Sequence, residues 1–127
     1  MLGTKLVLMP SVAAVMFDDA GRVLLARRPP TGVWSGLWSL PEADGHDAAR
    51  AFVAAHAPVD FDAAEALPLI EHVFSHYRLH IEPLLWHGSP APRRVGDNDD
   101  VRWHPLDRLE DVGLPAPVRK LLEGMPR

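Results

Sequence analysis

Residues 28–42 constrain this chain more than any other segment, and they read Arg-Pro-Pro-Thr-Gly-Val-Trp-Ser-Gly-Leu-Trp-Ser-Leu-Pro-Glu. Proline, glycine and tryptophan are interleaved here, whereas a plain connecting loop is mostly polar. The segment follows an apolar run at residues 23–26 and precedes an alanine-rich stretch that begins near Gly45. We therefore expect a long, structured loop between a strand and a helix, and loops of that length in compact domains are usually functional.

The size and composition of the chain fit one globular domain. Its 127 residues are 47% hydrophobic and 24% charged, which is enough to build one core. We assign residues 11–127 to a single domain and residues 1–10 to an N-terminal tail or linker. The chain has no cysteine, which excludes disulfides, thiolate metal sites and a cysteine nucleophile, and suits a reducing compartment. No apolar stretch approaches the roughly 20 residues of a membrane span, so we expect a cytoplasmic protein without membrane contact.

The residue pattern predicts alternating strands and helices without internal repeats. Apolar runs at residues 12–17 and 22–27, joined by Asp18-Asp19-Ala20-Gly21, indicate a compact hairpin. Residues 47–56 favour a helix, which Pro58 ends. Further strands are expected at residues 67–73, 77–86 and 101–104, with helical turns from Leu106 and from Ala116. Together these elements predict an α/β sandwich (α+β) with a mixed β-sheet.

Three segments, taken together, resemble one family. Residues 28–41 resemble the signature Arg-Pro-Pro-x-Gly-(apolar)-Trp-x-Gly-Leu-Trp-x-(apolar)-Pro in the C-terminal, Nudix-like domain of MutY-type adenine DNA glycosylases. Residues 72–79 resemble that family's Phe-Ser/Thr-His loop, and residues 113–122 resemble its closing helix. The resemblance covers about residues 28–122 and implies a Nudix-like α/β/α sandwich.

The resemblance also implies a function in base excision repair, namely helping to select adenine mispaired with 8-oxoguanine. Guanine offers N7 as an acceptor, whereas 8-oxoguanine carries an N7–H donor and an O8 acceptor, so fixed polar groups can distinguish the two bases. On the matching motif, we expect Ser75 to hydrogen-bond the lesion, assisted by the backbone of Phe74 and His76. His76 is also a candidate for base or phosphate contact. Arg78, Arg28 and Trp34 complete the expected DNA-binding set.

Structural roles remain open for several of these residues. Phe74 at a strand end has the character of a core residue. Trp34 and Trp38 can stack on bases, but a loop rich in proline and glycine also needs apolar anchors, and packing is favoured for Trp38. Arg78 suits either a phosphate contact or a plain surface position, while Arg28 suits support of the Pro-Pro loop.

Net charge argues against strong autonomous DNA binding. The chain carries 13 Lys and Arg against 17 Asp and Glu, a net charge of −4, whereas autonomous duplex binders are usually basic. We therefore expect this domain to contribute more to recognition than to affinity, with another domain supplying most phosphate contacts.

A competing enzyme hypothesis is hydrolysis of nucleotide substrates by a stand-alone Nudix protein. That chemistry needs a helix with Arg-Glu-(apolar)-x-Glu-Glu, whose carboxylates hold magnesium against the pyrophosphate. Residues 50–55 read Arg-Ala-Phe-Val-Ala-Ala, so alanine replaces all three glutamates. An active hydrolase would need substitute carboxylates from Asp97, Asp99 or Asp100. We expect neither a catalytic residue nor a metal site in this chain.

Histidines spaced four residues apart do not change that expectation. His72, His76 and His80 share one face if they lie in a single strand, but successive members are then about 13 Å apart at roughly 3.3 Å per residue. Such a distance is too large for shared coordination of one ion.

The catalytic part of the resembling family is a separate N-terminal helical domain with a Glu/Asp pair and a cysteine-held 4Fe–4S cluster. This chain has no cysteine, so we expect no cofactor in it and no excision by it alone. The expected partners are double-stranded DNA with an 8-oxoguanine:adenine mispair and an N-terminal glycosylase domain. A protein-interaction module that uses the Trp34/Trp38 loop remains a third alternative.

Overall fold

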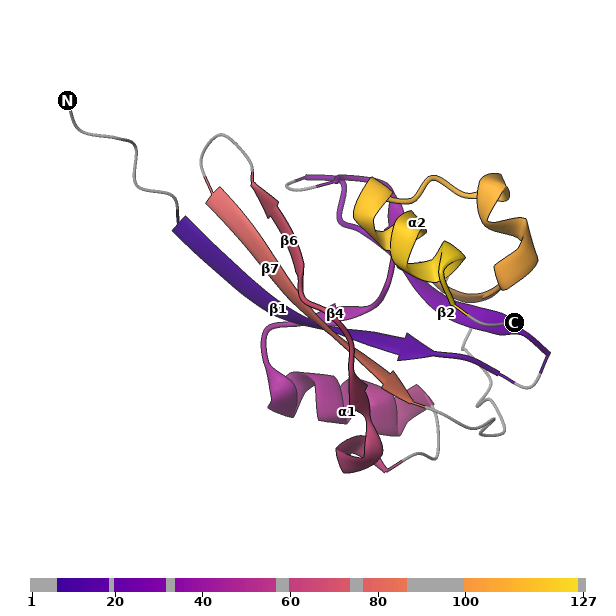
Figure 1. The fold of residues 1–127 in the computed structure, drawn as a ribbon, viewed down its shortest axis with the longest axis horizontal. Helices are drawn as coiled ribbons and strands as arrows, with labels where there is room; N and C mark the ends of the chain where they lie inside the picture. Colours follow the sequence, from indigo (N-terminus) through magenta and orange to yellow (C-terminus); the bar gives the residue numbers. More distant parts are fainter. Residues whose placement is uncertain are drawn as a thin grey trace.

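The computed structural model describes residues 7–18, 20–31, 34–56, 60–73, 77–86 and 100–125. These residues form a mixed sheet with strand order β4-β1-β7-β5, in which β6 also pairs with β7, and an antiparallel sheet with order β3-β2-β8 (Figure 1). The mixed sheet consists of β1 (Val7–Met16), β4 (Glu42–Ala43), β5 (Glu65–Ala66), β6 (Ile70–Val73) and β7 (Tyr77–Trp86). The antiparallel sheet consists of β2 (Arg22–Arg27), β3 (Trp38–Ser39) and β8 (Val101–Pro105).

Within the described ranges, two α-helices and two 3₁₀ helices accompany the sheets. They are α1 (His46–His56), η1 (Phe61–Ala63), η2 (Leu106–Asp111) and α2 (Ala116–Glu123). The alanine-rich segment forms α1 as expected, because alanine has the highest helix propensity. No helix among the described residues is long and apolar enough to cross a membrane.

The centre of the mixed sheet is a long parallel pair. Strand β1 runs beside β7 in an uninterrupted register from Val7 opposite Tyr77 to Met16 opposite Trp86. The sequence pattern placed the start of this strand at Val12, whereas the observed strand begins at Val7. All the other strand pairs are antiparallel.

The expected hairpin of residues 12–17 and 22–27 is wrong as a pair of hydrogen-bonded strands. The turn does form, but β1 and β2 enter different sheets, and among the described residues the only bridge at this turn joins Phe17 to Val23. The physical reason is competition for partners, because β7 occupies one edge of β1 along its whole length while β8 pairs with β2. The turn is therefore a corner between two sheets.

Alternating side chains of β1 pack into two core clusters on opposite faces of the mixed sheet. Ala13 and Val15 join the cluster that contains Val118 and Leu122 of α2. Val12, Ala14 and Met16 join the cluster that contains Ala49 and Val53 of α1. Helix α1 therefore covers one face, while the antiparallel sheet, η2 and α2 cover the other (Figure 1). This arrangement confirms the expected α+β sandwich with a mixed sheet.

Candidate nucleic-acid interface

The loop rich in proline, glycine and tryptophan lies against the β6–β7 hairpin. The rings of Trp34 and His72 have centroids 5.5 Å apart and are tilted by 55°. His72 belongs to β6, which leads into residues 74–76. The structure thus brings together two segments that are far apart in sequence and that were both expected to contact DNA.

Backbone hydrogen bonds close this loop on itself. The N–H of Arg28 donates to the carbonyl of Leu37 at 2.7 Å, and that of Gly36 donates to the carbonyl of Pro29 at 3.1 Å. Trp34 has φ = 51°, in the left-handed region that residues other than glycine rarely adopt. Backbone strain of this kind persists where the surrounding structure enforces it, commonly at ligand-binding sites. Here it turns the half-buried Trp34 toward β6.

The side chain of Arg28 links the loop to β4. Its guanidinium pairs with the Glu42 carboxylate and lies 5.8 Å from the ring centroid of Trp34. The other oxygen of Glu42 accepts a hydrogen bond from the Ser11 hydroxyl at 2.8 Å. The side chain of Arg28 is only 18% exposed, so this geometry supports the structural role that the sequence left open.

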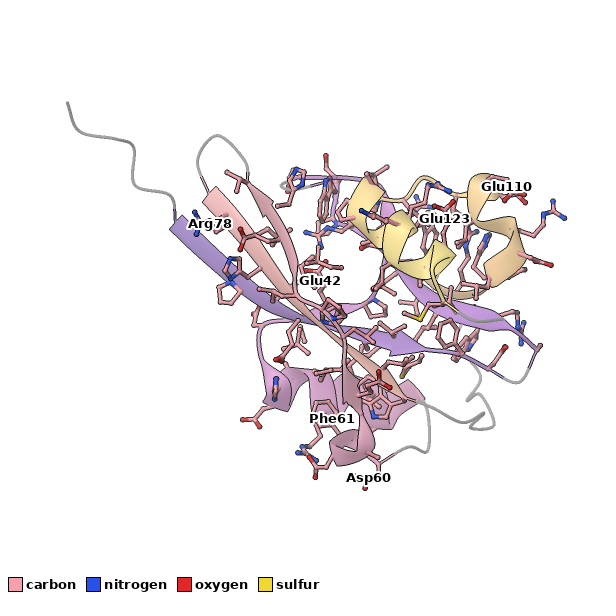
Figure 2. The ribbon with its side chains drawn as sticks, in the orientation of Figure 1. Glu42, Asp60, Phe61, Arg78, Glu110 and Glu123 are labelled. Carbon is pink, nitrogen blue, oxygen red and sulfur yellow. The ribbon has the colours of Figure 1, made fainter. Side chains whose placement is uncertain are left out.

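Arg78 lies on the opposite face of the hairpin from Trp34. Along β7 the buried side chains of Leu79 and Ile81 face the cluster that includes α2, and the exposed Arg78 alternates with them (Figure 2). Its ladder partner Val73 is also exposed, at 54%. Arg28 and Arg78 are therefore separated by the sheet.

Phe74, Ser75 and His76 lie outside the described residues. The strands that flank them are described, and Val73 pairs with Arg78 in the antiparallel β6–β7 ladder. The remaining expected residues, Arg28 and Trp34, belong to the loop that contacts this hairpin.

The histidines of the hairpin do not share a face. His72 is opposite Leu79 in the ladder, whereas His80 is opposite Glu71 and pairs with its carboxylate at 2.7 Å. A shared face was expected only if both lay in a single strand, whereas the register of the antiparallel β6–β7 ladder places them on opposite faces. No group of three His, Asp or Glu side chains suited to a metal ion occurs within the part of the chain that the structure describes.

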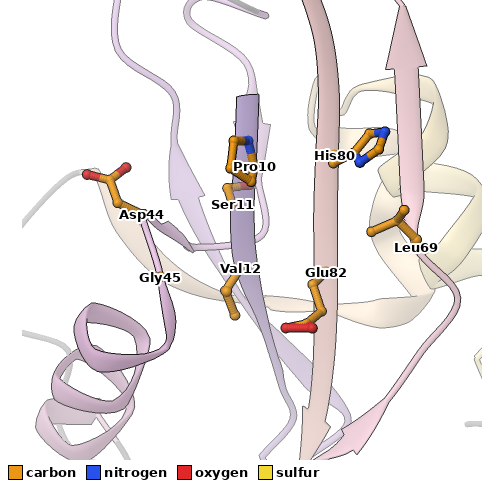
Figure 3. Close-up of a pocket in the computed structure, with 8 residues that line it drawn as sticks. All are labelled: Pro10, Ser11, Val12, Asp44, Gly45, Leu69, His80 and Glu82. Atoms are coloured by element: carbon orange, nitrogen blue, oxygen red, sulfur yellow. The ribbon is translucent and has the colours of Figure 1, made fainter. Parts of the chain in front are cut away.

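A pocket of about 290 Å³ lies on the α1 side of the mixed sheet (Figure 3). It is lined by Pro10, Ser11, Val12, Asp44, Gly45, Leu69, His80 and Glu82. Two histidine–carboxylate pairs, His80–Glu71 and His46–Glu82, connect the strands and α1 around it. These contacts link β6 with β7 and β7 with the start of α1.

Helix α1 retains its packing face and lacks carboxylates where a hydrolase needs them. Ala49 and Val53 are buried against the sheet, at 2% and 1% exposure. The three alanines that replace the glutamates, at positions 51, 54 and 55, are exposed. Arg50 binds Asp62 at 2.9 Å and lies over the ring of Phe61, and so attaches η1 to the helix.

Of the three aspartates that could substitute for the missing glutamates, Asp100 alone belongs to the described residues. Asp97 and Asp99 lie outside the described residues. Asp100 lies instead beside β2, where its backbone carbonyl accepts a hydrogen bond from the N–H of Arg27 at 2.7 Å.

Trp38 packs in the core, as favoured from the sequence, and two arginines stack on it. Its exposure is 7%, and the guanidinium carbons of Arg27 and Arg102 lie 5.0 and 4.2 Å from its ring centroid. Sequence reasoning missed Arg102, because only the β2–β8 register, with Leu25 opposite Arg102, brings it to this ring. No local motif signals that register.

Comparison with known proteins gives consistent matches. The model of the NUDIX domain family matches residues 12–124. Adenine DNA glycosylase from Buchnera aphidicola subsp. Acyrthosiphon pisum is 27% identical over 92 residues, which cover 72% of this chain and 26% of that protein. The chain thus spans about a quarter of the length of this curated relative.

Two solved structures share the fold. The C-terminal domain of mouse MUTYH, in its complex with human PCNA, has a TM-score of 0.70 and 19% identity over 90% of this chain and 84% of that one. The MutT NUDIX hydrolase from Burkholderia pseudomallei has a TM-score of 0.67 and 22% identity over 94% of this chain and 98% of that one. The same scaffold therefore occurs in the C-terminal domain of mouse MUTYH and in a MutT NUDIX hydrolase.

Proposed function

Because this chain belongs to the NUDIX domain family and is a Nudix-like domain of the MutY C-terminal type, we propose that it recognises 8-oxoguanine paired with adenine during base excision repair in the cytoplasm. The observation that carries the proposal is the contact between Trp34 and His72, with ring centroids 5.5 Å apart. It braces the base of the hairpin that carries Phe74, Ser75 and His76.

A braced hairpin suits the reading of a base edge. Discrimination between guanine and 8-oxoguanine depends on whether the groups that face N7 and position 8 donate or accept hydrogen bonds. Such groups discriminate best when their supports are rigid, because ordering them on binding costs free energy. Val73 and Arg78, which flank this segment in the sequence, pair in the β6–β7 ladder, and Trp34 packs against His72 on one face of that ladder.

The surface of α1 supports recognition in preference to hydrolysis by the same scaffold. Exposed methyl groups of Ala51, Ala54 and Ala55 offer no oxygen ligand for magnesium. Cleavage of the adenine glycosidic bond belongs, in this proposal, to a glycosylase domain that carries the iron–sulfur cluster. The present domain orients the complex on the lesion pair.

We expect Ser75→Ala to reduce the preference for lesion DNA roughly tenfold, since one well-placed base contact contributes about 1–3 kcal/mol of discrimination. The measurement is an amide chemical-shift titration of the chain with duplexes containing 8-oxoguanine:adenine or guanine:adenine, which gives a dissociation constant for each. Ser35→Ala is the matched control, because Ser35 is an exposed serine in the neighbouring loop. It should leave the ratio of the two constants unchanged.

Two results would count against the proposal. The first is equal affinity of the unmodified chain for both duplexes, which would reduce the domain to a backbone-contacting accessory. The second is an unchanged preference in Ser75→Ala, which would remove this side chain from recognition.

A further inference from the structure

We propose that Arg27 and Arg102, both stacked on Trp38, form a clamp for the phosphate backbone of DNA. This inference rests on the proposed DNA-binding function and assigns its phosphate contacts to residues on the antiparallel sheet. These two residues form the arginine pair.

The arginine pair is built by the strand register. Strand β2 pairs with β3 so that Arg27 is opposite Trp38, and with β8 so that Leu25 is opposite Arg102. Directly opposed residues share a face, as do alternate residues in one strand. Arg27, Trp38 and Arg102 therefore project from the same face, and both guanidinium carbons come within 5.0 Å of one ring centroid.

The two charges of the pair are weakly compensated. Asp100 is the one carboxylate within ion-pair distance of either arginine among the described residues, and it lies 3.9 Å from Nε of Arg27. Both partners are well exposed, at 49% and 67% of their side-chain surface, and exposed pairs contribute little free energy. By contrast, the charge of Arg28 is matched by Glu42 in a largely buried pair.

Stacking on tryptophan prepares the guanidinium groups for phosphate. A guanidinium that lies over an aromatic face keeps its N–H edges available, and those edges match two phosphate oxygens at once. Both guanidinium carbons lie close enough to the Trp38 ring centroid for cation–π attraction. The side chains are thus partly ordered before binding, which lowers the entropic cost of forming the contact.

The location favours a DNA backbone over other anions. Arg27 directly precedes the loop of residues 28–37 and Trp38 directly follows it, so the pair lies at the stem of the loop whose Trp34 contacts the β6–β7 hairpin. In a chain with a net charge of −4, clustering two weakly compensated arginines here concentrates positive potential where a phosphate needs it.

The test is the salt dependence of duplex binding by Arg102→Gln, compared with Arg108→Gln. Both changes remove one positive charge, but Arg108 lies in η2, where it pairs with Asp111. Arg102→Gln should weaken binding to lesion and undamaged duplexes equally, by roughly five- to tenfold, and should lower the slope of log K against log salt by about 1. Arg108→Gln should alter neither quantity.

Two further readouts make the test specific. The Nε–Hε resonances of Arg27 and Arg102 should shift when DNA is added. Arg102→Lys should retain most of the salt slope but lose part of the affinity, because lysine keeps the charge without the planar stack. Preserved amide dispersion in Arg102→Gln shows that the fold is intact. Equal weakening by Arg102→Gln and Arg108→Gln, or unshifted guanidinium resonances, would overturn the clamp.

Failure of the clamp is distinguishable from failure of lesion recognition. If lesion and undamaged duplexes bind equally well, lesion recognition by residues 74–76 is refuted, whereas the clamp proposal is unaffected. If Arg102→Gln leaves the slope of log K against log salt unchanged, the clamp proposal is refuted, whereas lesion recognition is unaffected. Binding of an acidic peptide in preference to DNA at the same resonances would assign the pair to a protein partner and refute the proposal.

Discussion

Leu25→Ala should lower the free energy of unfolding by about 3–4 kcal/mol, since burial in a close-packed core adds a cavity cost to the lost transfer free energy. Leu25 is 0% exposed and lies in β2, the central strand of the antiparallel sheet. It belongs to the cluster that includes Leu106, Val118 and Leu122. The substitution therefore removes contacts between the sheet and both C-terminal helices at once.

Chemical denaturation followed by tryptophan fluorescence measures this change. Leu69→Ala provides the control, because the same truncation is made at a side chain that is 54% exposed. A surface substitution of that kind should change stability by no more than about 0.5 kcal/mol. A loss below about 1 kcal/mol in Leu25→Ala would show that the core refills the cavity and that the two layers are less tightly packed than described.

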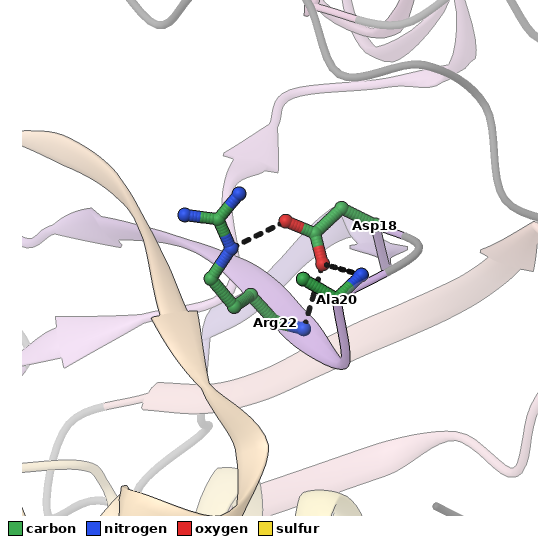
Figure 4. A network of polar contacts seen from close by, with 3 residues as sticks. All are labelled: Asp18, Ala20 and Arg22. Carbon is green, nitrogen blue, oxygen red and sulfur yellow. Dashed lines mark hydrogen bonds and ion pairs between the residues drawn. The ribbon is translucent and has the colours of Figure 1, made fainter.

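Asp18→Ala should destabilise the domain by about 3 kcal/mol, because several donors lose one common acceptor. One oxygen of Asp18 accepts from the backbone N–H groups of Ala20 and Arg22 at 2.9 and 2.8 Å, while the other binds Nε of Arg22 (Figure 4). The Asp18 side chain is 0% exposed. Alanine removes this buried acceptor from all three donors, and the loss includes a charge-assisted bond that is stronger than a neutral one.

Asp18→Asn separates charge from geometry. The amide oxygen can still accept from the backbone while the charge-assisted bond to Arg22 is lost, so the expected destabilisation is about half that of alanine. Asp107→Ala removes an exposed aspartate elsewhere and should be nearly neutral. Thermal and denaturant unfolding of the three variants would contradict the argument if Asp18→Ala and Asp107→Ala were equally stable.

Much of the fold follows from local pattern, and its failures have a common cause. Helix α1 and strands β7 and β8 could be predicted, because alanine content, apolar runs and proline positions are signals that can be read from a few consecutive residues. The pairing of β1 was not predicted, because β7 as its parallel partner comes from a distant part of the chain. The turn at residues 18–21, which reads Asp-Asp-Ala-Gly, has the composition of a hairpin, and composition does not reveal which sheet each strand joins.

The features of the candidate site also divide into those that local sequence predicts and those that depend on strand pairing. The loop of residues 28–42 and the packing of Trp38 were predicted from composition, since aromatic residues between prolines and glycines need something to pack against. The contacts of Trp34 with His72 and of Arg102 with Trp38 depend on strand register, which has no local signature. For residues 74–76 the motif is the basis of the prediction.

The parallel pairing of β1 with β7 also fixes where a domain joined ahead of Val7 would be tethered. Val7 lies opposite Tyr77, so the incoming chain reaches the sheet one strand spacing, about 4.8 Å, from the strand that follows residues 74–76. A linker to such a domain need not cross this one to bring the two into reach of the same base pair. Under the proposed function, a short tether would raise the local concentration of this domain around DNA held by the other domain, and so would offset a weak DNA affinity of this domain alone.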